Sequence, residues 1–240
     1  MEYVEGIVLK SIDYKDASKI LYLYTKDGNH SMIAHSVKKM NNLNRFLSQP
    51  CNKIKYTHTK SAFPSLKEAE LLKNYEAIKS DLICYAYVNH MFELVKNTIS
   101  DDLDHHKMYN FVIRLLTLFE ALIDPEILTF IFELKLLHFL GNGLNFKACS
   151  ICSKTDNLVF SIDYGGLVCS EHLDTHQERF NAQTYNIIKK LYYIDIDEYY
   201  NIEIDKFARV KIRQIINQFY DQYVSYRSKS LRIIKQLQKY

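Results

Sequence analysis

The sequence predicts an α+β protein in which a small β domain precedes a larger helical domain. Three observations lead to this fold class. Roughly the first 75 residues carry short apolar segments bounded by turn signals, which is typical of strands. From Ser80 onward apolar residues recur at intervals of three and four, the helical period. A set of cysteine and histidine residues at metal-ligand spacing interrupts the helical part. We expect a β domain over residues 1–78 and a helical domain over residues 79–240, with the metal-binding insertion at 145–175.

Five short strands are expected in the N-terminal part, over residues 3–10, 19–25, 30–35, 51–59 and 66–73. The last range could also begin a helix. Asp27-Gly28, between the second and third ranges, is a hairpin signal. Five strands within about 80 residues are compatible with an OB-fold β-barrel, which binds single strands along a groove. Residues 36–49 lack strand character and would form the long loop beside that groove.

The remaining chain is expected to be mostly helical. Ranges 81–99 and 106–123 each carry one apolar face. A third helix is expected to begin at Pro125, with Asp124 as its N-cap, and to stop at Gly141. It is apolar nearly all round, which predicts the central buried helix of a bundle. Further amphipathic helices are expected over residues 182–192, 204–223 and 224–237.

The most specific motif is a pair of knuckles. Cys149 and Cys152 read C-x2-C, and Cys169 and His172 read C-x2-H after a sixteen-residue gap. This pattern suits one tetrahedral Zn²⁺, and because all four positions are filled it indicates a structural metal rather than a catalytic one. His176 could compete with His172 as the fourth ligand. Two alternatives are a degenerate site that has lost its metal and redox or catalytic thiols. Between the knuckles, residues 158–167 are expected to form a hairpin that turns at residues 164–166.

Composition excludes several classes of protein. The hydrophobic content of 48% and charged content of 25% are ordinary for a globular protein. No apolar run approaches the roughly 20 residues that span a bilayer, so no membrane partner is expected. There is no GxxxxGK[ST] and no GxGxxG motif, so the sequence lacks the known glycine-rich loops that bind nucleotide phosphates. The opening MEYVEGIVLK has no apolar signal region, so we expect a reducing cytoplasm and no disulfide framework.

Positive charge is segregated along the chain, although the net charge is only +3. No Asp or Glu lies between Asp27 and Glu68, and none follows Asp221. Such segregation indicates a nucleic-acid binder, with a solvated face as the alternative. The candidates for phosphate contact are Lys38, Lys39, Arg45, Lys53, Lys55, Lys60, Lys10 and Lys19, with Lys15 beside the first turn. Aromatic residues that could stack on bases, or could equally be core, are Tyr22, Tyr24, Phe46 and Tyr56.

Three stretches of the chain are distinctive: EGIVLKSIDYKDASKILYLYTKDGN, DPEILTFIFELKLLHFLGNGLNFKACSIC and YRSKSLRIIKQL. They resemble the RecO family of bacterial recombination and repair mediators, and the resemblance extends nearly end to end. The middle stretch is the specific one, because it joins a capped helix, a glycine stop and the first knuckle in one register. One departure is the second knuckle, which is commonly CxxC in the family and ends in His172 here. A Cys3His set still binds zinc well.

The resemblance implies a non-enzymatic function in DNA repair, DNA damage response and recombination. RecO-like proteins bind single- and double-stranded DNA and anneal complementary strands. With RecR they help to load recombinase onto DNA coated by single-strand-binding protein (SSB), in the RecF pathway, and the acidic tail of SSB is one docking partner. The expected location is the cytoplasm, in association with the nucleoid.

Other functions are compatible with parts of the sequence. A zinc-ribbon protein acting on RNA or in transcription would also need a basic β domain and a metal site. A structural adaptor between proteins would need neither. A zinc-dependent nucleobase deaminase needs P-C-x-x-C, and here Ala148 precedes Cys149. The sequence therefore favours a binding protein over an enzyme.

Overall fold

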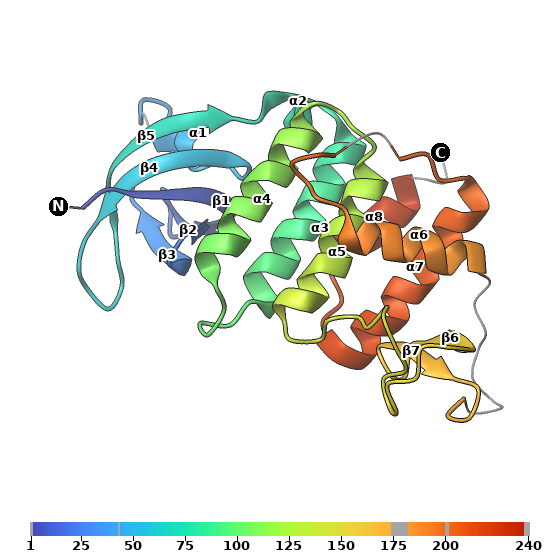
Figure 1. The fold of residues 1–240 in the computed structure, drawn as a ribbon. Coiled ribbons are helices and arrows are strands. Elements are labelled where there is room, and N and C mark those ends of the chain that lie inside the picture. The colour runs from blue at the N-terminus through green and yellow to red at the C-terminus, as the bar shows by residue number, and fades with distance from the viewer. Residues whose placement is uncertain (1, 43, 174–181, 200–201, 238–240) are drawn as a thin grey trace. The chain divides into compact units, whose positions relative to one another are not determined.

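The computed structural model describes residues 2–42, 44–173, 182–199 and 202–237 (Figure 1). The chain forms two compact units: Met1–Pro125 together with Ser228–Tyr240, and Glu126–Arg227. The C-terminal segment thus belongs to the same unit as the N-terminal strands. A domain boundary at residue 78 and an insertion at 145–175 stay predictions.

The N-terminal strands form one antiparallel sheet in the order β3-β2-β1-β4-β5. The strands are β1 Val4–Tyr14, β2 Ser18–Thr25, β3 Gly28–Ala34, β4 Asn52–His58 and β5 Leu66–Asn74. The β-rich start is therefore confirmed, and the range that could also have begun a helix is strand β5. Gly28, at the hairpin between β2 and β3, has a φ of +117°, which a glycine adopts without a Cβ clash.

The two edges of this sheet approach each other without forming a continuous ladder. Ile33 on β3 and Ser65 form an isolated parallel bridge, and the Ile33 N–H donates to the Pro64 carbonyl at 2.9 Å. The residues that meet β3 precede β5, so β5 itself does not extend the pairing. The expectation of a closed barrel is thus corrected: the described strands form an open, OB-like sheet, as partly open five-stranded barrels do.

All five strands contribute to one apolar core, and in β2, β3 and β4 the contributing residues alternate, as the period of two requires. Its members are Val8, Leu21, Leu23, Met32, Ala34, Val37, Leu47, Ile54, Tyr56 and Leu66. Val37 and Leu47 come from the β3–β4 connection, which includes the short helix α1 Asn44–Leu47. The long connection is therefore anchored to the core at two points.

Helices complete the first unit. They are α2 Glu76–Ser80, α3 Leu82–Thr98, α4 His105–Glu120 and α8 Ser230–Leu237. Aspartates begin two of them: Asp81 accepts a hydrogen bond from the Cys84 N–H at 2.8 Å, and Asp104 accepts one from the Lys107 N–H at 3.0 Å. The helical ranges 81–99 and 106–123 are confirmed to within a few residues, whereas α2 was not predicted.

The last helix is shorter than the range 224–237. A π-helical turn, η1, spans Tyr220–Val224, and Ser225 ends it in the left-handed conformation with φ +54°. The helix α8 begins only at Ser230, where Glu93 of α3 accepts hydrogen bonds from the Lys229 N–H at 2.7 Å and the Ser230 hydroxyl at 2.8 Å. A distant carboxylate thus sets where this helix starts.

The second unit contains α5 Pro125–Phe139, α6 Ala182–Tyr193 and α7 Lys206–Phe219. All but one of the residues from Ile127 to Leu137 are buried, so the prediction of a buried helix is confirmed. Its one buried carboxylate, Glu133, accepts two hydrogen bonds at 2.7 Å from Nη1 of Arg213 on α7. In the part of the chain that the structure describes, no helix has both the length and the apolar character for a membrane crossing.

Candidate metal centre and nucleic-acid interface

A small hairpin in the second unit carries the second knuckle. Its strands are β6 Leu158–Ser161 and β7 Gly166–Cys169, which pair antiparallel, so the predicted hairpin is confirmed. Gly165 turns the chain with φ +59°. Gly166 lies in β7, and a Cβ there would clash with the backbone of Asn145. That close approach allows the Leu167 N–H to donate to the Asn145 carbonyl at 2.9 Å, which places the first knuckle beside the hairpin.

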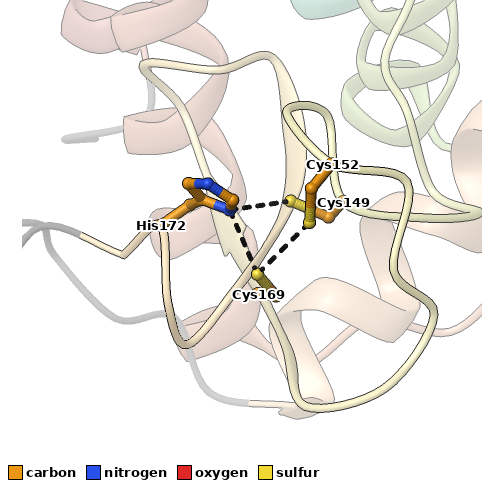
Figure 2. Close-up of side chains that lie close together, drawn as sticks. All are labelled: Cys149, Cys152, Cys169 and His172. Carbon is orange, nitrogen blue, oxygen red and sulfur yellow. Dashed lines mark hydrogen bonds between the residues drawn. The ribbon is translucent and has the colours of Figure 1, made fainter.

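The four predicted ligands converge on one point. The donor atoms of Cys149, Cys152, Cys169 and His172 all lie within 4.8 Å of one another. The Cys152 and Cys169 sulfurs are 3.6 Å apart, and His172 Nδ1 lies 3.3 Å from the Cys169 sulfur and 3.9 Å from the Cys149 sulfur (Figure 2). Bond lengths of about 2.3 Å (Zn–S) and about 2.05 Å (Zn–N) in a tetrahedron place such atoms about 3.5–3.8 Å apart. This donor set therefore fits a tetrahedral metal ion. His176 lies outside the described residues, so its competition with His172 stays a prediction.

Backbone N–H groups that donate hydrogen bonds to the Cys149 and Cys152 sulfurs act to lower the pKa of these thiols. Burial alone would raise the pKa of the Cys149 thiol, but N–H groups of Cys152, Cys169 and Ile151 lower that pKa to about 6. The Lys154 N–H lowers the pKa of Cys152, yet desolvation and the neighbouring sulfurs outweigh it, so the net pKa is raised. The thiolate is the form that ligates metal, and the backbone donors favour that form of Cys149.

Aromatic rings hold the hairpin within the second unit. Phe146, just before the first knuckle, stacks on Phe160 of β6 with centroids 5.5 Å apart and an interplanar angle of 3°. Phe160 in turn meets Phe219 of α7 at 5.9 Å. The Tyr223 hydroxyl donates to the Ile162 carbonyl at 2.9 Å, on the turn of the hairpin. The metal cluster therefore sits on an apolar base as well as on its own ligands.

Two of the candidate phosphate-binding lysines are paired with carboxylates from β1. Lys38 Nζ lies 3.0 Å from Asp13 Oδ2, and Lys53 Nζ lies 2.9 Å from Glu5 Oε2. These acids precede the acid-free stretch in sequence but lie against it in the sheet. The segregation of charge along the chain is thus partly cancelled in space.

The other candidates differ in exposure. Lys10, Lys39, Arg45 and Lys60 are exposed, whereas Lys19 and Lys55 are half-buried. Lys55 Nζ lies 4.9 Å from the centre of the Tyr3 ring. Arg45, on α1, donates from Nη1 to the sulfur of Met40 at 3.1 Å.

Three connections of the sheet are joined by hydrogen bonds. The Lys38 N–H donates to the Ala17 carbonyl at 3.0 Å, which ties the β3–β4 connection to the β1–β2 turn. His35 Nε2 lies 3.2 Å from the Ser65 hydroxyl, which ties it to the β4–β5 connection. We call residues 15–17, 35–39 and 59–65 the three-loop surface. It includes Lys15, Lys38, Lys39 and Lys60, so the fold gathers cations that the sequence separates.

The aromatic candidates divide into core and surface. Tyr24 and Tyr56 are completely buried, so these two do not stack on a ligand, because the sheet places them in its interior and against α4. Tyr22 is half-buried with Lys96 Nζ 4.4 Å above its ring, and Phe46 is exposed beside Lys79. Sequence reasoning missed Phe63, which is 80% exposed. A Phe-Pro pair within the polar stretch between two strands was the signal that could have found it.

Two family models cover the chain. The model described as "Recombination protein O N terminal" matches residues 1–75, and the model described as "Recombination protein O C terminal" matches residues 79–232. Proteins of Bacillus cereus (strain AH187) and Bacillus anthracis, each named DNA repair protein RecO, are 27% identical over 242 aligned positions, covering 99% of this chain and 98% of theirs. The protein of the same name from Bacillus cytotoxicus is 26% identical over the same share. The chain therefore belongs to the RecO family.

Proposed function

We propose that this chain is a DNA repair and recombination mediator. It binds single- and double-stranded DNA, anneals complementary strands and, with RecR, helps to load recombinase onto SSB-coated DNA in the RecF pathway. The observation that carries the proposal is the match of both RecO family models over nearly the whole chain. The exposed cations of the three-loop surface also support the proposal, because such side chains can contact DNA phosphates. The place of action would be the cytoplasm, on the nucleoid.

Phosphate neutralisation is the physical basis of the proposed DNA binding. Lys39, Arg45 and Lys60 are exposed cations on connections of the OB-like sheet. Each phosphate contact releases condensed counterions, so log affinity falls by about 0.7 to 0.9 per log unit of salt for each contact. Annealing needs no nucleotide hydrolysis, since it requires only that two phosphate backbones approach while the base edges stay accessible.

The proposed protein partners are RecR and the acidic tail of SSB. The helix α8 is a candidate surface for either of them or for DNA. Its residues Arg232 and Lys235 are exposed, while Ile234 is buried. The charge fits an acidic peptide as well as a phosphate backbone, so these alternatives stay open.

The proposed cofactor is one structural Zn²⁺ per chain, held by Cys149, Cys152, Cys169 and His172. Four protein ligands leave no position for water or substrate, which is the arrangement of a structural site. The ion would fasten the first knuckle to the β6–β7 hairpin. The cytoplasm keeps such thiols reduced and able to bind metal.

The test is an annealing assay on complementary strands coated with SSB, with and without RecR. We expect this protein to accelerate annealing without ATP and RecR to change the rate on coated strands. A strict requirement for ATP, or no effect on annealing and no DNA retention at low salt, would refute the proposal. Comparison with matched RNA strands separates DNA binding from the zinc-ribbon alternative, because recognition through the 2′-OH requires RNA.

A further inference from the structure

A single phenylalanine stands exposed on the β4–β5 connection. Phe63 is 80% exposed, whereas Leu66, the first residue of β5, is buried. Isolated exposed apolar residues are common on protein surfaces and carry no meaning by themselves. The position of Phe63 is informative because of the loop that holds it and the charges around it.

The connection that carries Phe63 is held by its own hydrogen bonds. The Thr59 N–H donates to the Ser65 carbonyl at 3.0 Å, and the Ser65 N–H donates back to the Thr59 hydroxyl oxygen at 2.9 Å. The Ser61 hydroxyl donates to the carbonyl of Phe63 itself at 2.8 Å. Both ends and the tip of the loop are therefore fixed.

Contacts with the sheet add to this rigidity. The Ile33 N–H donates to the Pro64 carbonyl at 2.9 Å, so the residue after Phe63 is tied to β3. A proline also restricts the backbone of the residue before it to extended conformations. In Figure 1 the β4–β5 connection extends beyond the strands that it joins. The aromatic ring is thus presented to solvent at little further cost in backbone entropy on binding.

The surroundings of Phe63 are cationic. Lys60 is exposed in the same connection, and Lys38 and Lys39 lie in the connection that His35 joins to it through Ser65. Neither of these two connections contains an acidic residue, although Asp13 of β1 pairs with Lys38. An exposed aromatic ring among exposed cations is a combination that binds single-stranded nucleic acid, because the ring stacks on a base while the cations contact phosphates.

We propose that Phe63 is the stacking platform for an unpaired base of single-stranded DNA bound to the three-loop surface. This inference rests on the proposed DNA binding. It adds a residue that contacts the base and a preference for single strands over duplex. Bases inside a duplex already stack on their neighbours, so Phe63 discriminates single strands from duplex. The cations contact phosphates, which single-stranded and duplex DNA share, so they do not discriminate between the two.

The test compares Phe63→Ala with the wild-type protein, using a single-stranded oligodeoxythymidylate and a duplex of equal length. We expect affinity for the single strand to fall by about 5- to 150-fold, the range that removal of one stacking residue produces, with little change for duplex. Phe63→Tyr keeps the ring and should retain binding, whereas Phe63→Leu keeps only apolar character and should lose it. Phe207→Ala removes an exposed phenylalanine (69% exposed) from α7 and serves as the matched control.

A second readout reports on the ring directly. An abasic single strand should bind the wild-type protein more weakly than an intact strand, and Phe63→Ala should no longer distinguish the two. Equal loss for single strand and duplex, or full binding by Phe63→Leu, would overturn the inference. Unchanged DNA affinity of Phe63→Ala together with lost RecR binding would assign the ring to a protein contact and also overturn it. A wild-type protein with no salt-sensitive DNA binding would instead refute the proposed function.

Discussion

Lys38 Nζ lies 3.0 Å from the carboxylate of Asp13, 25 positions upstream in the sequence. Because both side chains remain partly in solvent, the pair contributes little to stability, about 0–1 kcal/mol. The pair matters for DNA binding, because a phosphate must compete with Asp13 for Lys38. The same reasoning holds for Lys53 and Glu5, which lie 2.9 Å apart.

Removing the Asp13 carboxylate should strengthen DNA binding. We expect Asp13→Asn to raise affinity a few-fold and to steepen the salt dependence by up to one phosphate contact, about 0.7–0.9 log units. Fluorescence anisotropy across a salt series measures both quantities. Asp156→Asn, at an exposed position outside the three-loop surface, controls for the change in net charge. Equal gains in the two variants would show that only overall charge matters.

Charge reversal at Lys38, Lys39 and Arg45 should have the opposite effect. The triple change to Glu removes up to three phosphate contacts, so the salt slope should flatten by about 2–3 units and the affinity should fall. Filter binding over the same salt series checks the slope. Lys206→Glu, at an exposed position on α7, serves as the control. A slope that stays at the wild-type value would place the DNA site elsewhere.

Loss of a knuckle cysteine should release metal. Cys149→Ser or Cys152→Ser should reduce zinc from stoichiometric to a minor fraction and destabilise the Glu126–Arg227 unit by several kcal/mol, because binding free energy is also folding free energy. Elemental analysis and urea unfolding test this, with Cys51→Ala as the cysteine control outside the cluster. His172→Cys should retain the ion and His172→Ala should lose it. Stoichiometric zinc in the Cys149 variant would show that the ligands are different.

The buried pair Glu133–Arg213 should be costly to break. Arg213→Met removes the guanidinium that donates to a carboxylate that is 1% exposed, and we expect a loss of about 3–5 kcal/mol in the free energy of unfolding. Replacing both residues with Met should recover much of that loss, since the buried carboxylate is then removed together with its guanidinium partner. Urea unfolding of the two variants gives the comparison. A double variant less stable than Arg213→Met would show that the pair itself is strongly net stabilising.

Acid should weaken the N-terminal sheet through His30. Burial is the main cause that lowers the pKa of His30, His58 adds to it, and Asp27 opposes it. The folded protein therefore favours neutral His30, whose Nδ1 lies 2.8 Å from the Tyr56 hydroxyl. The unfolded chain takes up this proton near pH 6.5, so stability should fall as pH drops below about 6.5 toward the lower folded pKa.

Thermal unfolding between neutral pH and about pH 5 measures this effect. His30→Gln keeps a hydrogen-bonding group and should flatten the pH dependence. His106→Gln, at an exposed position, should leave the dependence as it is in the wild type. If His30→Gln loses as much stability in acid as the wild type, groups other than His30 cause the loss.

Most of the elements that could be predicted from the sequence depend on short motifs. Asp27-Gly28 defines a hairpin, Pro125 begins α5, and the spacing of the two knuckles identifies four candidate ligands that the structure brings together. Each of these depends on residues close together in the chain. The short helix α2 was missed because its five residues carry too little periodicity, and the π-helical turn at Tyr220–Val224 has no pattern in sequence that separates it from an α-helix.

The sequence by itself therefore predicted the five strands and the longer helices along the chain, the spacing of the four candidate metal ligands and the cationic character of the region between Asp27 and Glu68. Only the tertiary structure decided that Asp13 and Glu5 neutralise Lys38 and Lys53, that Tyr56 is core, and that the sheet stays open beside β5. The reason is physical: backbone propensity and ligand spacing act over a few residues, whereas burial and ion pairing depend on which distant segments the sheet brings into contact.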